Sequence, residues 1–264
     1  VVLTETGAGA TSLANYTTTS ACTNAAGTAV TVGGTALAPS VTIPQSVTGA
    51  SANGRAQTIT CTLTNTRKAT ITVNKVTVNG VGGPFAFSAT NATGTFTSAS
   101  TTTAGVPTLV GTLPLAALAT STTILESAFT GYSLTGISCT GLGAGAANPS
   151  INANGQGGSV TLTAAAAVAG ADIICTFTNT KNPTLTVTKT ASQEPLVKGQ
   201  DNQFYTITIN VANGPTVAPI TIADTLPTGI TINGLLSATG GTLSGCPSTG
   251  STTGFSPRFQ TLLT

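Results

Sequence analysis

Threonine alternates with β-branched or aromatic apolar residues in many short runs of this chain. Runs of this kind are T-I-T-V at residues 70–73, L-T-V at 185–187 and Y-T-I-T-I at 205–209. This alternation has the period of a β-strand with one buried face, and β-branched threonine suits the outer face of a strand. Asn-Gly pairs, which favour tight turns, separate several of the runs. The pattern predicts an all-β fold made of β-sandwiches in series.

Two alanine-rich stretches are the candidates for helical structure. Residues 113–119 are compatible with a short helix, because a proline such as Pro114 is tolerated in a first helical turn. Residues 164–171 carry a glycine and lie between strand-like runs, which argues against a helix there. We expect at most one short helix, over residues 113–119.

The chain has few groups that could carry out catalysis or bind a metal. Its 264 residues include eight Lys or Arg, six Asp or Glu and no His. Without His, no Ser-His-Asp or Cys-His site can form, and six scattered carboxylates argue against a calcium site. A net charge of +2 gives no basic surface for nucleic acid. We therefore expect a structural or binding protein, not an enzyme, with no cofactor, no metal and no nucleic-acid partner.

The sequence also lacks an apolar run of about 18 residues, the length that a transmembrane helix needs. We therefore expect no membrane insertion in this segment.

An internal repeat organises the chain. Residues 58–75 read T-I-T-C-T-L-T-N-T-R-K-A-T-I-T-V-N-K, and residues 172–189 read D-I-I-C-T-F-T-N-T-K-N-P-T-L-T-V-T-K. Upstream of each copy, a glutamate is followed by a tyrosine and a cysteine; the glutamates are Glu5 and Glu126. A repeat of this length corresponds to a whole domain.

The repeat predicts three units, at residues 1–66, 67–181 and 182–264. The middle unit is expected to be complete, since it opens with the T-I-T-V-N-K strand and closes with the C-T-F-T-N strand. The first unit lacks an opening strand and is expected to be truncated at its N-terminal side. The third unit opens with P-T-L-T-V-T-K, then diverges, and is expected to be incomplete.

Scarce polar groups fall on the apolar faces of the predicted strands. Because side chains alternate along a strand, Lys75 shares a face with Ile71, and Glu126 shares one with Ile124. Asn179 lies on the face of the Cys and Phe that precede it in its strand. Burial lowers the pKa of a lysine and raises that of a glutamate. A neutral amine is a nucleophile and a protonated carboxyl can donate to an amide carbonyl, so an asparagine beside them could be attacked.

Further motifs connect the units to known families. The middle unit has an opening strand with Lys75, followed by G-G-P-F-A-F-S, L-E-S-A-F-T-G-Y-S-L and C-T-F-T-N-T. In these residues it resembles the prealbumin-like B-type module of collagen-adhesin-type bacterial surface proteins. The third unit, through Lys189, Tyr205, V-A-N-G and residues 224–227, resembles the Asp-Thr-Leu-Pro repeat domain of very large bacterial surface proteins. The resemblances imply tandem immunoglobulin-like or prealbumin-like β-sandwiches, located on a cell surface or filament.

The resembled B-type modules form a Lys–Asn isopeptide bond between their first and last strands. The resemblance implies such a bond from Lys75 to Asn179, with Glu126 as the catalytic group that promotes it. The residues alone leave an alternative, in which Lys75 and Glu126 form an ion pair near a strand end and Asn179 makes a turn. The matching residues in the other units are Glu5, Asn65, Lys189 and Asp224.

Four of the five cysteines occupy matched places in the repeat. The pairs are Cys22 with Cys61 and Cys139 with Cys175, so we expect one disulfide in each unit; buried free thiols are the alternative. Disulfides indicate an oxidising compartment and thus export. No cysteine pair has the spacing of a zinc finger. Cys246 is left without a partner.

These observations predict a structural subunit or repeat segment of an extracellular bacterial fibre or surface stalk. Its partners would be copies of itself, as a homopolymer, or adjacent repeats of the same long chain. In one version, the third unit donates a strand to the incomplete first unit of the next subunit. In the other, residues 1–264 are a fragment of a longer chain.

The alternative function is an adhesin module that binds a host protein or glycan. Binding sites of this kind are rich in surface aromatics, whereas only 4% of this chain is aromatic. The sequence places five of these residues in the core, namely Phe85, Phe87, Phe177, Tyr132 and Tyr205. The structural role is therefore favoured.

Overall fold

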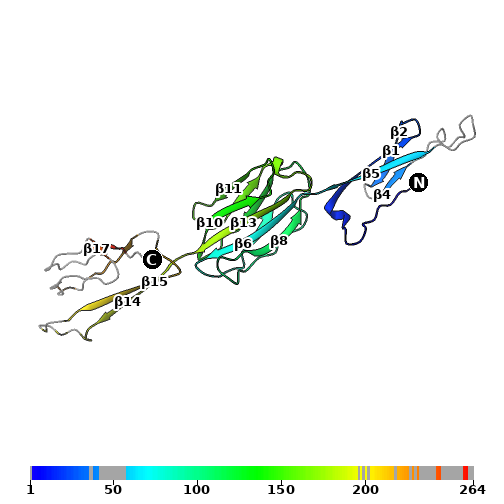
Figure 1. Cartoon of the computed structure of the whole chain (residues 1–264). Coiled ribbons are helices and arrows are strands. Elements are labelled where there is room, and N and C mark those ends of the chain that lie inside the picture. The colour runs from blue at the N-terminus through cyan, green and yellow to red at the C-terminus, as the bar shows by residue number, and fades with distance from the viewer. Residues whose placement is uncertain are drawn as a thin grey trace, which may run out of the picture.

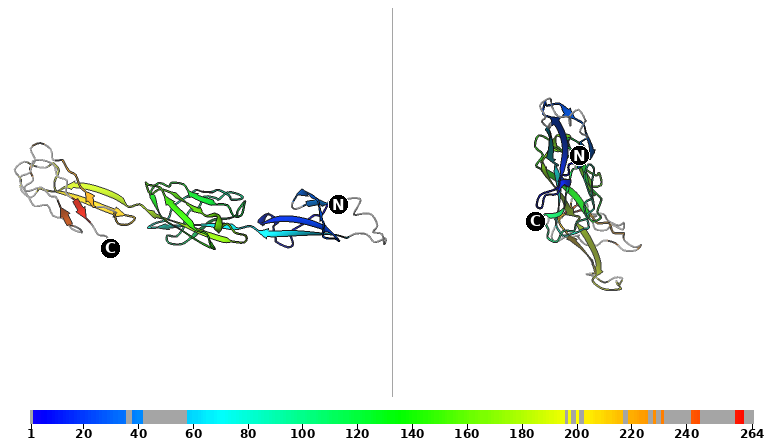
Figure 2. Two further views of the ribbon diagram at one scale, coloured as in Figure 1. Left: turned by 90° about the horizontal axis from the view of Figure 1, so that it is seen from above. Right: turned by 90° about the vertical axis from the view of Figure 1, so that its right-hand side faces the viewer.

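In the described part of the chain, the regular secondary structure is almost entirely β-strand, as predicted. The computed structural model describes residues 2–35, 38–41, 58–195, 197, 200, 203–216, 219–225, 228, 231, 242–244 and 258–260. Helical structure in these residues consists of two 3-10 helices, η1 (Leu13–Asn15) and η2 (Ala164–Ala166). Three parts follow one another in a row, coloured blue to cyan, cyan to green, and yellow to red in Figure 1, and the same order is visible in Figure 2.

The middle part is a sandwich of two four-stranded sheets. The first sheet has the order β10 (Tyr132–Thr140), β13 (Asp172–Lys181), β6 (Thr70–Val78), β8 (Thr108–Pro114). The second has the order β11 (Ala147–Ile151), β12 (Gly158–Leu162), β9 (Thr122–Glu126), β7 (Phe87–Ala89). Strands β6 and β13 are the first and last of this part, and they pair in parallel at the centre of their sheet.

The alternation of side chains determines which face of each strand is buried. In β6, Ile71 and Val73 are fully buried in the core between the sheets. The intervening Thr72 points outward, where its hydroxyl lies 2.8 Å from that of Thr112 on β8. Apolar residues on one face and threonines on the other therefore explain why so weakly charged a sequence folds as a sandwich.

The prediction of a short helix over residues 113–119 is wrong, because these residues form the end of a strand and a turn. Leu113 and Pro114 belong to β8, where Leu113 pairs with Ile71 and Pro114 with Thr70. Pairing with β6 buries apolar surface that an isolated alanine-rich turn could not bury, so Leu113 and Pro114 form part of a strand instead. Pro114 lies at the end of the strand, where its missing N–H disturbs the ladder least.

The first part contains a smaller sheet with the order β2 (Ala29–Val30), β1 (Tyr16–Asn24), β5 (Ile59–Arg67). A hairpin of β3 (Val32–Thr35) and β4 (Ala38–Val41) accompanies it. Its core is small, with Cys22, Val30 and Val41 buried among the described residues. Within the described part of the chain, β5 pairs with β1 on one edge and with no strand on the other.

The third part begins with the hairpin of β14 (Thr184–Ala191) and β15 (Tyr205–Ala212). Short strands β16 (Ile220–Thr221), β17 (Thr242–Ser244) and β18 (Arg258–Gln260) form a second small sheet. Leu185 and Val187 on β14 are 49% and 59% exposed, and Tyr205 is 42% exposed. The expected core position of Tyr205 is therefore wrong: it begins β15, and its ring lies beside the exposed side chain of Lys189. Cys246 and residues 226–227 lie outside the described residues.

A polar junction joins the first and middle parts. Both terminal nitrogens of Arg67, at the end of β5, contact the carboxylate of Asp172, at the start of β13, at 3.0 and 2.9 Å. The Lys68 N–H donates to the carbonyl of Asn15 at 2.8 Å, and the Gly170 N–H donates to the carbonyl of Arg67 at 2.9 Å. Consecutive domains are therefore tied by more than the connecting backbone. No helix in the described regions is long and apolar enough to cross a membrane.

Candidate cross-linking site

Lys75 lies on the inner face of β6, on the core side that strand parity predicts, and its side chain is fully buried. The Nζ donates a hydrogen bond of 3.0 Å to the carbonyl of Phe177 on β13. It also lies 4.6 Å from the centre of the Phe85 ring, an arrangement that favours a cation. Tyr132 packs edge-on against Phe85 at 5.5 Å and holds that ring in place. A lysine is thus held between the two sheets.

Glu126 approaches Lys75 from the opposite sheet. It ends β9, is fully buried, and its Oε2 lies 3.2 Å from the Lys75 Nζ. Its Oε1 accepts a hydrogen bond of 2.5 Å from the Nδ2 of Asn179. Glu126 therefore contacts both a residue of β6 and a residue of β13.

Asn179 completes the group from the last strand of the domain. It is 1% exposed, and its register partner on β6 is Thr77, two residues beyond Lys75. Its Oδ1 is buried and accepts no hydrogen bond in the structure. An unsatisfied buried carbonyl of this kind costs roughly 1–3 kcal/mol. A protonated carboxyl beside it would remove that cost.

The surroundings shift both titrating groups toward their neutral forms. Burial lowers the pKa of Lys75 to about 8, an effect that the negative charge of Glu126 partly opposes. Burial raises the pKa of Glu126, and Lys75 and the Asn179 hydrogen bond oppose that rise. The lowered pKa of Lys75 and the raised pKa of Glu126 both favour transfer of a proton from the amine to the carboxylate. The site can therefore present a neutral amine, an acid and an amide together.

The first part holds two of the matching residues, and among the described residues no lysine forms a hydrogen bond or ion pair with them. The Nδ2 of Asn65 donates to Glu5 Oε1 at 2.5 Å, as Asn179 does to Glu126. The Thr18 hydroxyl donates to Asn65 Oδ1 at 2.6 Å. The second oxygen of Glu5, Oε2, is buried and accepts no hydrogen bond.

The third part brings Lys189 and Asp224 together as an ion pair. The Lys189 Nζ donates to both carboxylate oxygens, at 2.9 and 2.8 Å, and lies 4.4 Å from the centre of the Tyr205 ring. The side chain of Lys189 is 37% exposed and that of Asp224 is 16% exposed. This pair is open to solvent, unlike the buried pair of the middle domain.

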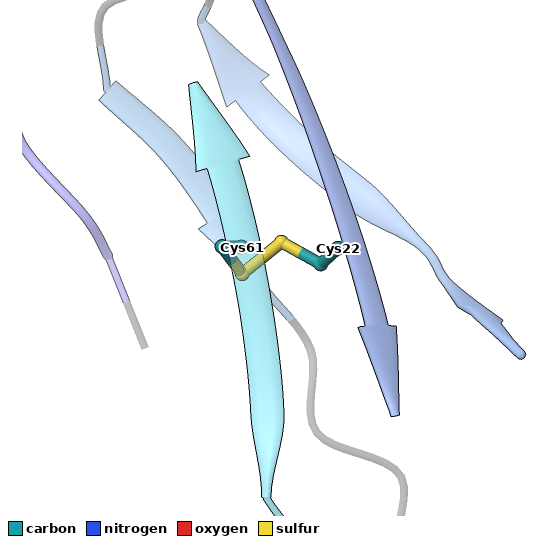
Figure 3. The surroundings of a disulfide bond; sticks show 2 residues. All are labelled: Cys22 and Cys61. Atoms are coloured by element: carbon teal, nitrogen blue, oxygen red, sulfur yellow. A yellow bond between two sulfur atoms is a disulfide. The ribbon is translucent and has the colours of Figure 1, made fainter. Parts of the chain in front are cut away.

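Both predicted disulfides are present. Cys22 is bonded to Cys61 across β1 and β5 (Figure 3), and Cys139 to Cys175 across β10 and β13. In each domain the two cysteines are direct antiparallel partners. The disulfides therefore occupy the same place in the two sheets.

Two contacts were not predicted from the sequence. Phe85 was expected in the core, but its position beside the ammonium of Lys75 carries no signal in the sequence. The ion pair of Arg67 and Asp172 was also missed, although both residues are scarce charges at the ends of repeated strands. Their opposite charges at matching strand ends could have indicated the pair.

Comparison with known families agrees with this geometry. Residues 71–181 match the family described as prealbumin-like fold domain, and residues 1–67 match a second family with the same description. A search of curated proteins and a search of solved structures each give no match. The matches end at residue 181, so they do not show the Asp-Thr-Leu-Pro repeat domain. Two SpaA-type prealbumin-like fold domains in tandem, at residues 1–67 and 71–181, thus make up most of this chain.

Proposed function

We propose that this chain is a load-bearing structural subunit, or repeat segment, of an extracellular bacterial fibre or surface stalk. The SpaA-type domains suggest a pilus or surface structural protein, and the two disulfides suggest an extracellular location. The observation that carries the proposal is the buried contact of Glu126 with both Lys75 and Asn179. It lies where the first and last strands of a domain run side by side.

In this proposal, Lys75 and Asn179 join in an isopeptide bond. Lys75 first passes a proton to Glu126, which leaves a neutral amine and a protonated carboxyl. The Nζ then attacks the Cγ of Asn179 while Glu126 donates to Oδ1. The Cγ–Nδ2 bond breaks, the amine proton goes to the leaving nitrogen, and ammonia departs as the amide forms. As the C=O bond re-forms, Oδ1 returns its proton to Glu126, and this proton leaves with the ammonia as ammonium. Glu126 is then a carboxylate again, and no cofactor or metal is required.

The bond would protect the domain under tension. A pulling force enters the middle domain through β6 and leaves through β13, and these strands are parallel neighbours. A covalent link between Lys75 and Asn179 carries that force past nearly all the residues between them. The rest of the sandwich then remains folded under load.

The proposed partners are further copies of this chain or adjacent repeats in one long chain. We keep the division of the chain at residues 1–66, 67–181 and 182–264 as part of the proposal. The likeness of residues 182–264 to an Asp-Thr-Leu-Pro repeat domain would extend the stalk by one more sandwich. Strand donation between subunits would need a free sheet edge, which the far side of β5 offers among the described residues.

Stretching single molecules of the whole chain under oxidising conditions tests the load-bearing role. In Lys75→Met, the 111 residues of 71–181 unfold except for the 36-residue loop that the Cys139–Cys175 disulfide closes. About 75 residues are thus released, roughly 250 Å of extended chain. The wild type should lack this step, and Lys181→Met should behave as the wild type. The same step in the wild type would contradict the proposal.

A further inference from the structure

A polar cavity lies at the junction between the first and middle domains. Its volume is about 340 Å³, at the small end of the range of ligand pockets, which is roughly 300–1,000 Å³. Eight of the ten residues that line it have polar side chains, so it suits a small polar ligand. Lys75, Glu126 and Asn179 are not among them, so the cavity is separate from the cross-linking site.

Both domains contribute to the walls, and hydrogen bonds hold the segment that connects them. Two residues, Lys68 and Ala69, separate β5 from β6. The Lys68 N–H donates to the carbonyl of Asn15 in the first domain at 2.8 Å. The carbonyl of the buried Ala69 accepts from the Leu115 N–H in the middle domain at 2.8 Å. The cavity is therefore formed in advance, which lowers the entropy cost of binding a ligand.

The cavity contains one positive charge that no described carboxylate neutralises. Arg67 and Lys68 both line it. The guanidinium of Arg67 is paired with the carboxylate of Asp172, at 3.0 and 2.9 Å. Lys68 is half-buried, and its ammonium forms no hydrogen bond or ion pair within the described part of the chain. A ligand with one negative charge would remove the cost of this unpaired cation.

Uncharged groups beside this ammonium are also open to a ligand. The hydroxyls of Thr11 and Ser12 and the amide of Asn15 form no hydrogen bond with other described residues. Half-buried Tyr16 is the aromatic residue of the wall and lies opposite Arg67 in the pairing of β1 with β5. An aromatic ring with hydroxyl and amide groups around it matches a sugar, which has an apolar C–H face and hydroxyls that donate and accept.

We infer that the junction cavity binds a sugar with one negative charge, such as a uronic acid, either free or at the end of a glycan. The Lys68 ammonium binds the carboxylate, and Tyr16 packs against the sugar ring. The free hydroxyl and amide groups of residues 11–15 bind the sugar hydroxyls. Thr70 and Thr112 of the middle domain form the facing wall, so the sugar contacts both domains. A phosphorylated sugar fits less well, because it carries up to about two charges.

A nuclear magnetic resonance titration of the whole chain with sodium glucuronate tests the site. We expect saturable shifts of the amides of residues 10–16, 67–70 and 112–114. Glucose has the ring without the charge, and acetate has the charge without the ring. Each should bind at least about tenfold more weakly than glucuronate. Acetate that binds as tightly as glucuronate would indicate a bare anion site and overturn the inference, as would the absence of saturable binding.

A disaccharide that ends in glucuronate distinguishes the two sources of the sugar. Tighter binding than that of glucuronate would indicate the end of a glycan, and weaker binding would indicate the free sugar. Either result agrees with an acidic-sugar site.

Chain variants test the assigned roles. Lys68→Met should weaken glucuronate binding at least about tenfold and leave glucose binding unchanged, because it removes the charged donor alone. Tyr16→Leu should weaken the binding of both sugars, because it removes the ring. The matched variant Lys181→Met changes a half-buried lysine at the end of β13 and should bind glucuronate as the wild type does. Equal glucuronate binding by Lys68→Met and the wild type would overturn the inference.

A ligand that contacts both domains should also restrict their movement. Fluorescence energy transfer between labels on the first and middle domains should give a narrower distance distribution when glucuronate is added. Lys68→Met should show no narrowing at the same glucuronate concentration. Saturable glucuronate binding that leaves the distribution of the wild type unchanged would contradict a site shared by the two domains. None of these results depends on the bond between Lys75 and Asn179, so the proposed function is tested separately.

Discussion

The Nζ of Lys75 lies 3.2 Å from Oε2 of Glu126, and neither side chain is exposed. The two residues come from different sheets, so their contact crosses the core of the middle domain. A buried ion pair of this kind recovers its desolvation cost only with excellent geometry and further hydrogen bonds. Here Glu126 Oε2 and Asn179 Oδ1 accept none. The arrangement is therefore better suited to reaction than to stability as an ion pair.

Loss of the cross-link should lower the stability of the middle domain. Closing a loop of about 100 residues contributes about 5 kcal/mol on a loop-entropy estimate. We expect Lys75→Met to lower the free energy of unfolding by about that amount in urea titrations. Lys181→Met, which changes a half-buried lysine at the end of β13, should change it by about 0.5 kcal/mol or less. Equal stability of the two variants would argue against a covalent link.

The unreacted site should give an unusual dependence on pH. In Asn179→Ala, Lys75 and Glu126 remain but cannot cross-link. Because burial lowers the pKa of Lys75 to about 8, the unfolded chain binds more protons above that pH. The free energy of unfolding should thus rise from pH 8 to about 10, by up to about 1.4 kcal/mol per pH unit.

The raised pKa of Glu126 has the opposite effect at acid pH. Between its ordinary pKa and the raised one, the folded chain binds more protons, so the free energy of unfolding falls as pH rises. In urea titrations of Asn179→Ala, the free energy of unfolding should therefore pass through a minimum between the acid pH range, where it falls, and the alkaline range, where it rises. The wild type should lack the alkaline rise, because an amide nitrogen does not titrate. A rise of the same size in the wild type would be the contrary outcome.

The first domain should depend on its disulfide more than the middle domain does. The described core of the first domain has three buried apolar residues, whereas that of the middle domain has nineteen. A loop of 39 residues between Cys22 and Cys61 contributes about 4 kcal/mol on the same loop-entropy estimate. Reductant should therefore unfold the first domain and leave the middle one folded, as hydrogen exchange in β5 and β13 can measure. Loss of protection in both at once would contradict this order.

Removal of the junction pair should change the movement of the domains rather than their stability. Arg67 and Asp172 are 42% and 63% exposed, and exposed pairs contribute about 0–1 kcal/mol. Hydrogen bonds from Arg67 lower the pKa of Asp172, so the pair persists until acid pH and is lost as pH falls through that lowered pKa. We expect Arg67→Ala to broaden the interdomain distances seen by fluorescence energy transfer, with unchanged unfolding. An unchanged distance distribution would mean that the backbone alone sets the junction.

Strand parity predicted the inner faces of the middle domain because the sandwich covers them from both sides. Lys75, Glu126 and Asn179 could be placed there from the alternation alone. The same reasoning was wrong for Tyr205, because parity says which residues share a face but not whether another sheet covers it. The contact between Lys75 and Phe85 was equally out of reach, since it depends on how two sheets stack.

Peptide-resolved mass spectrometry of the oxidised, full-length chain tests the central claim most directly. The account predicts that the intact chain is lighter than its sequence by one ammonia, beyond the hydrogens lost to disulfides. After reduction and digestion, one branched peptide should contain both Lys75 and Asn179, and Glu126→Gln should abolish it. Lys75 and Asn179 recovered only in separate peptides of unmodified mass would contradict the account.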